Sequence, residues 1–208
     1  MRAAMDLSIK ALPKASPRPT VGAVIVQGRK IVGRGVTQPN GGLHAEVVAL
    51  QDAGQAARNS HMYLTLEPHG YQSTQPPCTD AIIRAGVSAV TFAVNDPNPR
   101  VAGTGARQLV KGGLQVEVGD GGHEASELHE AFFHFIQFNT PFVSVKFAAT
   151  LDGKIASSNG DSRWISGETA RDWSHQLRTE IQSIAVGSGT DALHLSYIFQ
   201  VRPYIYYL

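Results

Sequence analysis

Short apolar runs alternate with helical patterns along the first 120 residues, and this alternation constrains the fold more than any other feature of the sequence. Two β-branched runs meet at Gln27, Gly28 and Arg29 and predict a β-hairpin. An amphipathic helix that ends at Pro13 is expected before them. The later strands are expected in HMYLTLE, SAVTFAV and LQVEV, and the helices in AEVVALQDAG, TDAIIRAG and ARQLVKGG. This order predicts an α/β fold, a three-layer α/β/α sandwich around a mixed five-stranded sheet.

A second domain is expected after residue 140. The segment HEASELHEAFFHFIQF predicts one continuous helical stretch, and PFVSVKFAAT, which begins at Pro141, predicts a new strand. The predicted domains are therefore residues 1–140 and residues 141–208, the second an incomplete α/β domain.

Charge and cysteine content exclude several classes of function. Lys and Arg number 18 and Asp and Glu number 17, which gives a formal net charge of +1, and no block of like charge occurs. Neither a nucleic-acid partner nor a membrane partner is therefore expected. The single cysteine, Cys78, excludes an internal disulfide and favours a reducing compartment, so a cytoplasmic location is expected.

Four residues predict a catalytic zinc site. His44 and Glu46 begin one predicted helix, His69 follows a predicted strand, and Cys78 opens the next helix after two prolines. An H-x-E pair and a P-C segment that meet at two helix N-termini are typical of zinc nucleobase deaminases. We expect His44, His69 and Cys78 to hold Zn²⁺ and to leave the fourth position for water. Glu46 is then the catalytic proton carrier, since its carboxylate is not needed as a ligand.

Plainer interpretations of the same residues stay open. His44 and Glu46 also fit the first turn of an ordinary helix, His69 a solvated loop, and Cys78 a small buried apolar residue. A second histidine pair, His129 and His134, is separated by about 140° around a helix and is not expected to share a metal. The segment GTGARQ lacks the third glycine of a dinucleotide fingerprint and is interpreted as a loop that enters a helix.

The sequence also resembles the bifunctional deaminase–reductase family of riboflavin biosynthesis, the RibD family. The similar segments, in family order, are VGAVIV, HAEV, TLEP, PPCTDAIIRAG, DPNPRVAGTG and PFVSVKFAATLDGKIA. The resemblance implies a cytidine-deaminase-like fold and hydrolytic deamination of 2,5-diamino-6-ribosylamino-4(3H)-pyrimidinone 5′-phosphate. It further implies a small phosphorylated pyrimidine as substrate, a homo-oligomer, and an NADPH-dependent reductase domain.

Several positions depart from the family pattern. His69 stands where the family has its first zinc cysteine, Arg18 where it has an asparagine, and Thr37 where a histidine is usual. Imidazole is a legitimate zinc ligand, so the site is altered and not erased. Arg18 could instead meet a phosphate. The substrate-binding residues that the resemblance implies are Arg18, Asn40, Tyr71 and Thr74.

The reductase resemblance is limited to three segments, KFAATLDGKIA, SRWISGETARDWSHQLR and AVGSGT. NADP(H) binding is expected only where a complete reductase domain is present, and no reductase activity is expected from this chain alone. The cofactor-binding residues that the resemblance implies are Lys146, Asp152, Trp164, Ser166, Gly187, Gly189 and Thr190.

Two other functions compete with this deaminase. One is a zinc-poor scaffold with a deaminase fold that supports a reductase, and the other is a deaminase of a different nucleobase. Neutral charge and the lack of a basic stripe disfavour a base within RNA. Zinc content separates the scaffold from the enzymes.

Overall fold

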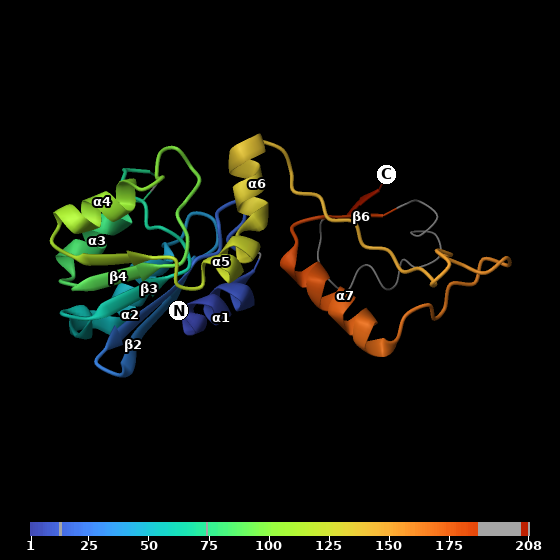
Figure 1. Cartoon of the computed structure of the whole chain (residues 1–208), viewed down its shortest axis with the longest axis horizontal. Helices are drawn as coiled ribbons and strands as arrows, with labels where there is room; N and C mark the ends of the chain where they lie inside the picture. The colour runs from blue at the N-terminus through green and yellow to red at the C-terminus, as the bar shows by residue number, and fades with distance from the viewer. Residues whose placement is uncertain (13, 74, 187–204, 208) are drawn as a thin grey trace. The chain divides into compact units, whose positions relative to one another are not determined.

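The protein divides into two compact units, Met1–Phe142 and Val143–Leu208, in a computed structural model (Figure 1). The structure describes residues 1–12, 14–73, 75–186 and 205–207. Pro13, the expected end of the first helix, lies outside the described residues. None of the described helices is long and apolar enough to cross a membrane.

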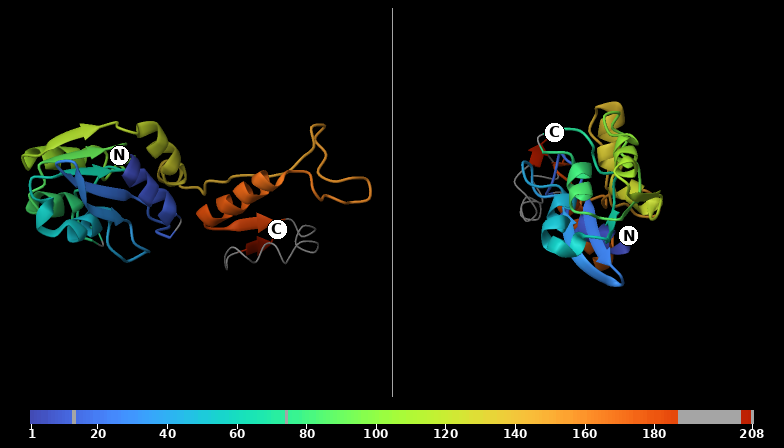
Figure 2. Two further views of the ribbon diagram at one scale, coloured as in Figure 1. Left: turned by 90° about the horizontal axis from the view of Figure 1, so that it is seen from below. Right: turned by 90° about the vertical axis from the view of Figure 1, so that its left-hand side faces the viewer.

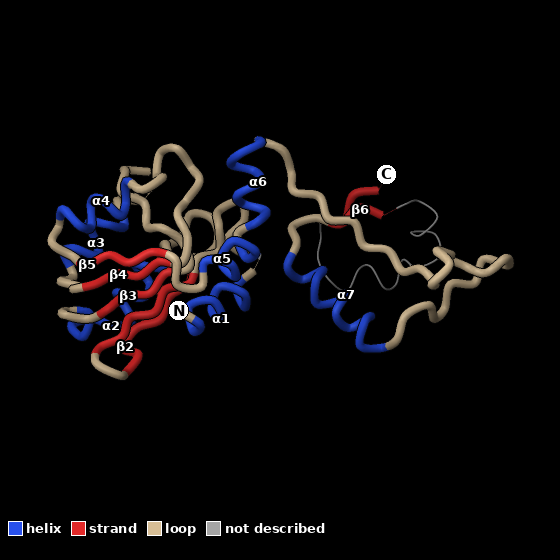
Figure 3. Tube along the Cα trace, viewed as in Figure 1, coloured by secondary structure: helices blue, strands red, loops and turns tan. Residues whose placement is uncertain are grey.

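A mixed five-stranded sheet forms the centre of the first unit (Figure 3), which confirms the prediction. The strand order is β2-β1-β3-β4-β5; β1 is antiparallel to both of its neighbours, and β3, β4 and β5 are parallel. Gly28, at φ 60°, makes the predicted hairpin turn between β1 and β2 possible. The strands are β1 (Gly22–Gln27), β2 (Lys30–Val36), β3 (His61–Leu64), β4 (Ala89–Phe92) and β5 (Gln115–Val118).

Helices cover both faces of this sheet, so the three-layer α/β/α architecture is also confirmed (Figure 2). Helix α1 contacts β1 and β2 on one face and also contacts α5, while α2 packs on the same two strands from the other face. Helix α3 lies beside α2 and α4. The helices are α1 (Arg2–Ala11), α2 (Ala45–Ala53), α3 (Cys78–Arg84), α4 (Thr104–Lys111), α5 (Gly122–Leu128) and α6 (Glu130–Phe138), with a 3₁₀ turn η1 (Gly54–Ala57) after α2.

Glycines on the first two strands allow this close packing. A Cβ atom at Gly33 or Gly35 would overlap the backbone of α2, and one at Gly22 would overlap the backbone of α1. Strand neighbours without side chains therefore let both helices approach the sheet. The position of α2 matters because His44 and Glu46 lie at its N-terminus.

The core lies between the sheet and the helices. Its largest fully buried aliphatic and aromatic members include Ile25, Met62, Leu64, Ile82 and Phe92. Each such side chain contributes about 1.5 to 3 kcal/mol by leaving water. The core fixes the strand ends from which the functional loops emerge.

Two predicted elements are shorter than expected. The third strand ends at Leu64 and not at Glu67. Just past its end the Gly22 amide donates to the Thr65 hydroxyl (3.1 Å), although the Thr65 amide still donates to the Gly22 carbonyl (3.1 Å). The helical stretch of residues 123–138 is broken at His129, which ends α5 and precedes α6 with φ −101° and ψ 9°. His129 is buried and its Nε2 lies 3.3 Å from the Thr65 hydroxyl, so one tertiary contact marks both irregularities.

The strand predicted at Pro141–Thr150 is wrong. These residues have no regular secondary structure, and Val143, Val145 and Phe147 are each more than 70% exposed. A β-strand needs a partner for its backbone groups, and no described strand pairs with this segment. The regular elements described in the second unit are α7 (Glu168–Glu180) and the parallel strands β6 (Ile184–Val186) and β7 (Ile205–Tyr207).

Candidate metal centre and pocket

Two helix N-termini and one loop present the four predicted catalytic residues. His44 is the extended N-cap of α2, and Glu46 lies in the first turn of that helix with 4% of its surface exposed. Cys78 is the first residue of α3 and is fully buried. His69 lies in the loop after β3 and is 8% exposed.

The structure brings His44, His69 and Cys78 together as one group of potential metal ligands. One donor atom from each lies within 4.8 Å of the other two. Cys78 Sγ and His44 Nδ1 are 3.5 Å apart, and the two imidazole centroids are 4.7 Å apart. Two imidazoles and one sulfur are a donor set that Zn²⁺ accepts, with three protein ligands as in catalytic sites.

One buried atom supports the fit to a metal independently. His69 Nε2 is buried and has no hydrogen-bond partner among the described residues. A buried polar atom without a partner typically reduces the stability of the fold by about 1 to 3 kcal/mol. Coordination of a metal ion would use the lone pair of His69 Nε2. The residues present therefore fit zinc.

Burial shifts the ionisation of the site toward neutral groups. Burial, followed by the charges of His69 and Arg18, lowers the pKa of His44 to about 4, so this imidazole is neutral and free to ligate at pH 7. Burial also lowers the pKa of His69 and raises the pKa of Glu46.

The protein surroundings raise the pKa of Cys78, through burial first and then through the charge of Glu46. The position of Cys78 at the N-terminus of α3 therefore does not by itself produce a thiolate. Metal binding releases the proton of a cysteine ligand, so a bound cation would give Cys78 the thiolate form that its protein surroundings disfavour.

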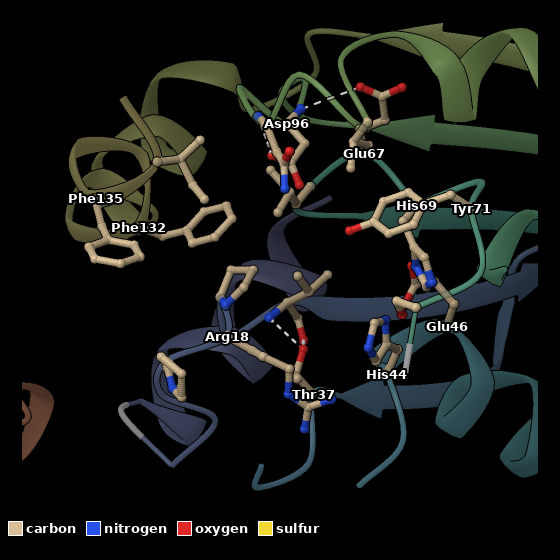
Figure 4. Close-up of a pocket in the computed structure, with 18 residues that line it drawn as sticks. Arg18, Thr37, His44, Glu46, Glu67, His69, Tyr71, Asp96, Phe132 and Phe135 are labelled. Carbon is tan, nitrogen blue, oxygen red and sulfur yellow. Dashed lines mark hydrogen bonds between the residues drawn. The ribbon is translucent and has the colours of Figure 1, made fainter. Parts of the chain in front are cut away.

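A cavity of about 340 Å³ opens beside this centre. Figure 4 shows His44, Glu46 and His69 at one end of the cavity and Phe132 and Phe135 of α6 at the other. This volume falls in the range of small-molecule sites. The remaining labelled lining residues are Arg18, Thr37, Glu67, Tyr71 and Asp96.

Glu67 anchors one wall of the cavity and was not recognised as a functional residue in the sequence. Its carboxylate accepts hydrogen bonds from the backbone amides of Gly103 (2.9 Å), Ala106 (3.2 Å) and Asp96 (3.4 Å). It thereby caps α4, whose N-cap Gly103 has no side chain for this purpose. Burial, with repulsion from Glu67, raises the pKa of Asp96 to about 6. Two sequence features could have indicated this role for Glu67: its acidic side chain at a predicted strand end, and a later helix that begins after Gly103, which has no side chain to cap it.

The predicted substrate residues have different surroundings. Arg18 lines the cavity, but its guanidinium donates to the backbone carbonyls of Gln38 (2.7 Å), Pro39 (2.7 Å) and Gly42 (3.0 Å). Tyr71 lines the cavity, whereas Asn40 is exposed and is not among the lining residues. Thr74 lies outside the described residues. The aromatic wall of Phe132 and Phe135 was not identified from the sequence, because helical periodicity does not say which site an apolar face lines.

Of the predicted cofactor residues that the structure describes in the second unit, most are exposed. Lys146 and Asp152 are exposed, and Trp164 is 65% exposed beneath the guanidinium of Arg171, 4.2 Å from its ring centroid. Asp152 and Trp164 line one open hollow, whereas Lys146 and Ser166 do not line it. Gly187, Gly189 and Thr190 lie outside the described residues.

Two family models match the sequence. "Cytidine and deoxycytidylate deaminase zinc-binding region" matches residues 1–94, and "RibD C-terminal domain" matches residues 141–193. The first match contains all four residues of the candidate centre.

Known proteins match most of the chain. The riboflavin biosynthesis protein RibD of Aquifex aeolicus is 44% identical over 202 residues, which are 96% of this chain and 57% of that protein. RibD of Synechocystis is 43% identical over 190 residues, 91% of this chain and 52% of the relative. The chain thus spans about half the length of these curated relatives.

Solved structures agree in fold. A diaminohydroxyphosphoribosylaminopyrimidine deaminase/5-amino-6-(5-phosphoribosylamino)uracil reductase from Thermotoga maritima gives a TM-score of 0.87 at 34% identity, covering 99% of this chain and 61% of that one. RibD from Acinetobacter baumannii gives a TM-score of 0.81 at 36% identity, covering 93% of this chain and 54% of that one. The predicted cytidine-deaminase-like fold is confirmed by these matches.

Proposed function

Because the chain belongs to the RibD family, we propose that its first unit is a zinc-dependent hydrolytic deaminase. The observation that carries this proposal is the convergence of His44, His69 and Cys78 beside a buried Glu46 at one end of a cavity. The proposed substrate is 2,5-diamino-6-ribosylamino-4(3H)-pyrimidinone 5′-phosphate. The similarity to the Thermotoga maritima diaminohydroxyphosphoribosylaminopyrimidine deaminase supports a diaminopyrimidine substrate.

His44, His69 and Cys78 are the proposed zinc ligands. Zinc, when bound by such a set, lowers the pKa of the attacking water. The protein contributes the rest through the buried carboxyl of Glu46, whose raised pKa suits a group that takes up and releases a proton. The water oxygen bonds to the ring carbon that carries the amine, while Glu46 accepts one water proton and delivers it to a ring nitrogen. Glu46 then transfers the remaining hydroxyl proton to the departing amine. The carbon–nitrogen bond to the exocyclic amine breaks, a carbonyl replaces it, and ammonia leaves.

The cavity suits a flat heterocycle with a polar substituent. The rings of Phe132 and Phe135 offer an apolar wall, and Asp96 and Asn98 offer polar groups at its side. Arg18 adds a positive charge to the lining, although its terminal nitrogens already bind three carbonyl groups. A small phosphorylated pyrimidine is therefore the proposed ligand class, and the homo-oligomer and the cytoplasmic location stay predictions.

The scaffold function is the second candidate, and a specific observation favours it. His69 occupies the position where the resemblance implies a cysteine ligand, so a site that no longer holds zinc would carry this kind of change. The two candidates differ in metal content and in ammonia release.

The test is zinc quantification on the purified chain after removal of loosely bound ions, together with ammonia release from the diaminopyrimidine substrate. We expect about one zinc per chain, because three ligands of suitable type converge. We expect Cys78→Ala to lose the zinc and His123→Ala, an exposed histidine of α5, to keep it. Less than about a tenth of one zinc would reject the deaminase and favour the scaffold. Full zinc without ammonia release from this substrate would favour another nucleobase.

A further inference from the structure

We propose that Tyr71 is a positioning residue that orients the imidazole of His69 for metal binding. The inference rests on the proposed zinc site. It connects Tyr71 to His69, the residue that stands where the family has a cysteine. Sequence resemblance alone places Tyr71 with the substrate residues, whereas its contacts connect it to the ligand histidine.

The contact between the two rings is direct. The centroids of Tyr71 and His69 are 5.4 Å apart with an interplanar angle of 74°, an edge-to-face arrangement. The His69 ring also contacts His44, at 4.7 Å between centroids and 49° between planes. Figure 4 shows Tyr71 beside His69 at the end of the cavity where His44 and Glu46 lie. The imidazole thus has an aromatic neighbour in addition to its fellow ligand.

Tyr71 is itself held in place by a cation. The guanidinium carbon of Arg100 lies 4.9 Å from the Tyr71 ring centroid. A cation at this distance is attracted by the electrons of the ring face and favours this ring position. No hydrogen bond found among the described residues involves the Tyr71 hydroxyl, so the ring makes the contacts that matter here.

A histidine ligand needs this support more than a cysteine does. The direction of the Nε2 lone pair depends on two side-chain torsions, and this atom is buried and unpartnered in His69. A cysteine sulfur has one torsion and no ring plane to orient. The edge contact from Tyr71 restricts rotation of the imidazole. Partners that hydrogen-bond to metal-bound histidines typically contribute about 10- to 100-fold in metal affinity, and a ring contact without a hydrogen bond is expected at the lower end of this range.

The test compares Tyr71→Ala in two backgrounds, the unsubstituted 208-residue chain and the His69→Cys chain. Zinc affinity is measured by competition with a chromophoric chelator, and the ligand geometry by the absorption spectrum of the Co²⁺ form. We expect Tyr71→Ala to weaken zinc binding about tenfold and to change the Co²⁺ spectrum when residue 69 is histidine. We expect less than about a twofold change when it is cysteine. Tyr71→Phe keeps the ring and is expected to bind zinc within about twofold of the unsubstituted chain.

Tyr63→Ala is the matched control. Tyr63 is also half-buried and stacks on a histidine, His61, at 4.3 Å between centroids, but neither residue belongs to the candidate centre. Its loss is expected to leave zinc affinity unchanged in the folded protein. Equal weakening by Tyr71→Ala in both backgrounds, or no weakening in either, overturns the role of Tyr71 while zinc binding by the unsubstituted chain still supports the deaminase. No zinc binding by the unsubstituted chain refutes both.

Discussion

His44 and Glu46 are separated by one residue at the start of α2, yet their surroundings assign them different chemistry. The His44 imidazole lies 3.5 Å from Cys78 Sγ, and its lowered pKa leaves the ring neutral and able to donate a lone pair. Glu46 is nearly fully buried, and burial raises the pKa of its carboxyl. A carboxyl group whose pKa is raised in this way suits proton transfer.

Glu46→Gln separates these two roles. We expect the variant to keep about one zinc per chain, since the glutamate is not one of the three proposed ligands, and to lose about 10²- to 10⁴-fold in deamination rate. Zinc content and ammonia release are the two measurements. Glu124→Gln, an exposed residue of α5, is the control and should leave both unchanged. Ammonia release within threefold of the unsubstituted chain would reject the role of Glu46, and loss of zinc would make it structural.

The residues proposed for the metal could be chosen from sequence because their types and order match a known chemistry. The pocket could not be predicted in the same way. Arg18 was expected to face the substrate, but three backbone carbonyls of residues 38–42 bind its guanidinium. Glu67 and Phe132 become visible as parts of the site only when the chain is folded, because their partners are far away in sequence.

At the scale of elements, the position of the metal centre depends on the distance between α2 and the sheet. A methyl group at Gly35 would overlap the Ala45 carbonyl and the Ala49 amide of α2. Ala45 lies between His44 and Glu46 in the sequence, so a displaced helix moves both functional side chains. Strand residues without any direct contact to the cavity thereby influence its chemistry.

Gly35→Ala tests this dependence. We expect a loss of about 2 to 3 kcal/mol in the free energy of unfolding from overpacking, and weaker zinc binding because α2 must shift. Urea unfolding and chelator competition measure the two effects. Gly167→Ala is the control, since nothing lies within 4 Å of a Cβ atom there and its φ of −68° suits alanine. Unchanged stability and zinc affinity in Gly35→Ala would show that α2 tolerates the added methyl group.

The break between α5 and α6 falls at the buried residue His129. Burial lowers the pKa of this imidazole to about 4 from an ordinary value of 6.5, although its contact with Thr65 acts in the opposite direction. Above pH 6.5 the imidazole is neutral in both the folded and the unfolded chain. As the pH falls from 6.5 toward 4, the unfolded chain takes up a proton that the folded chain resists, so stability is lost in this window.

His129→Gln is therefore expected to reduce the acid sensitivity of the first unit. His129 should reduce the free energy of unfolding by about 2 kcal/mol between pH 7 and pH 5. The variant should therefore lose about 2 kcal/mol less than the unsubstituted chain over the same pH change. Urea unfolding at the two pH values measures it. His123→Gln, with an exposed imidazole on α5, should behave like the unsubstituted chain. An equal loss of stability at pH 5 with and without His129 would contradict the assignment.

Element types were predictable from sequence, whereas element ends were not. The hairpin, the later strands and the helices that begin at Ala45 and Cys78 follow from local periodicity and turn residues. The end of β3 at Leu64 and the break at His129 lie beside tertiary contacts of Thr65, which local periodicity does not reveal. The strand expected after Pro141 failed for the same kind of reason, since strand formation depends on a partner that periodicity does not specify.

At the scale of the whole molecule, the two units differ in what they offer a ligand. The first has a closed three-layer core and a cavity with buried polar groups. In the described part of the second, Lys146 and Asp152 are exposed, and Trp164 contacts Arg171. The chain spans about half the length of its curated relatives.

The 208-residue chain is accordingly expected to deaminate without consuming NADPH. A dinucleotide needs a pre-formed site that buries much of its surface, and the hollow lined by Asp152 and Trp164 does not include Lys146 or Ser166. Ammonia release and NADPH absorbance can be followed in one reaction with the diaminopyrimidine substrate. The expected result is ammonia without loss of NADPH, and addition of zinc-chelating agent should abolish the ammonia. A full-length relative such as RibD of Aquifex aeolicus is the comparison, since the chain matches only 57% of it. Oxidation of NADPH in proportion to the ammonia released by this chain would show that the exposed residues of the second unit assemble a working site.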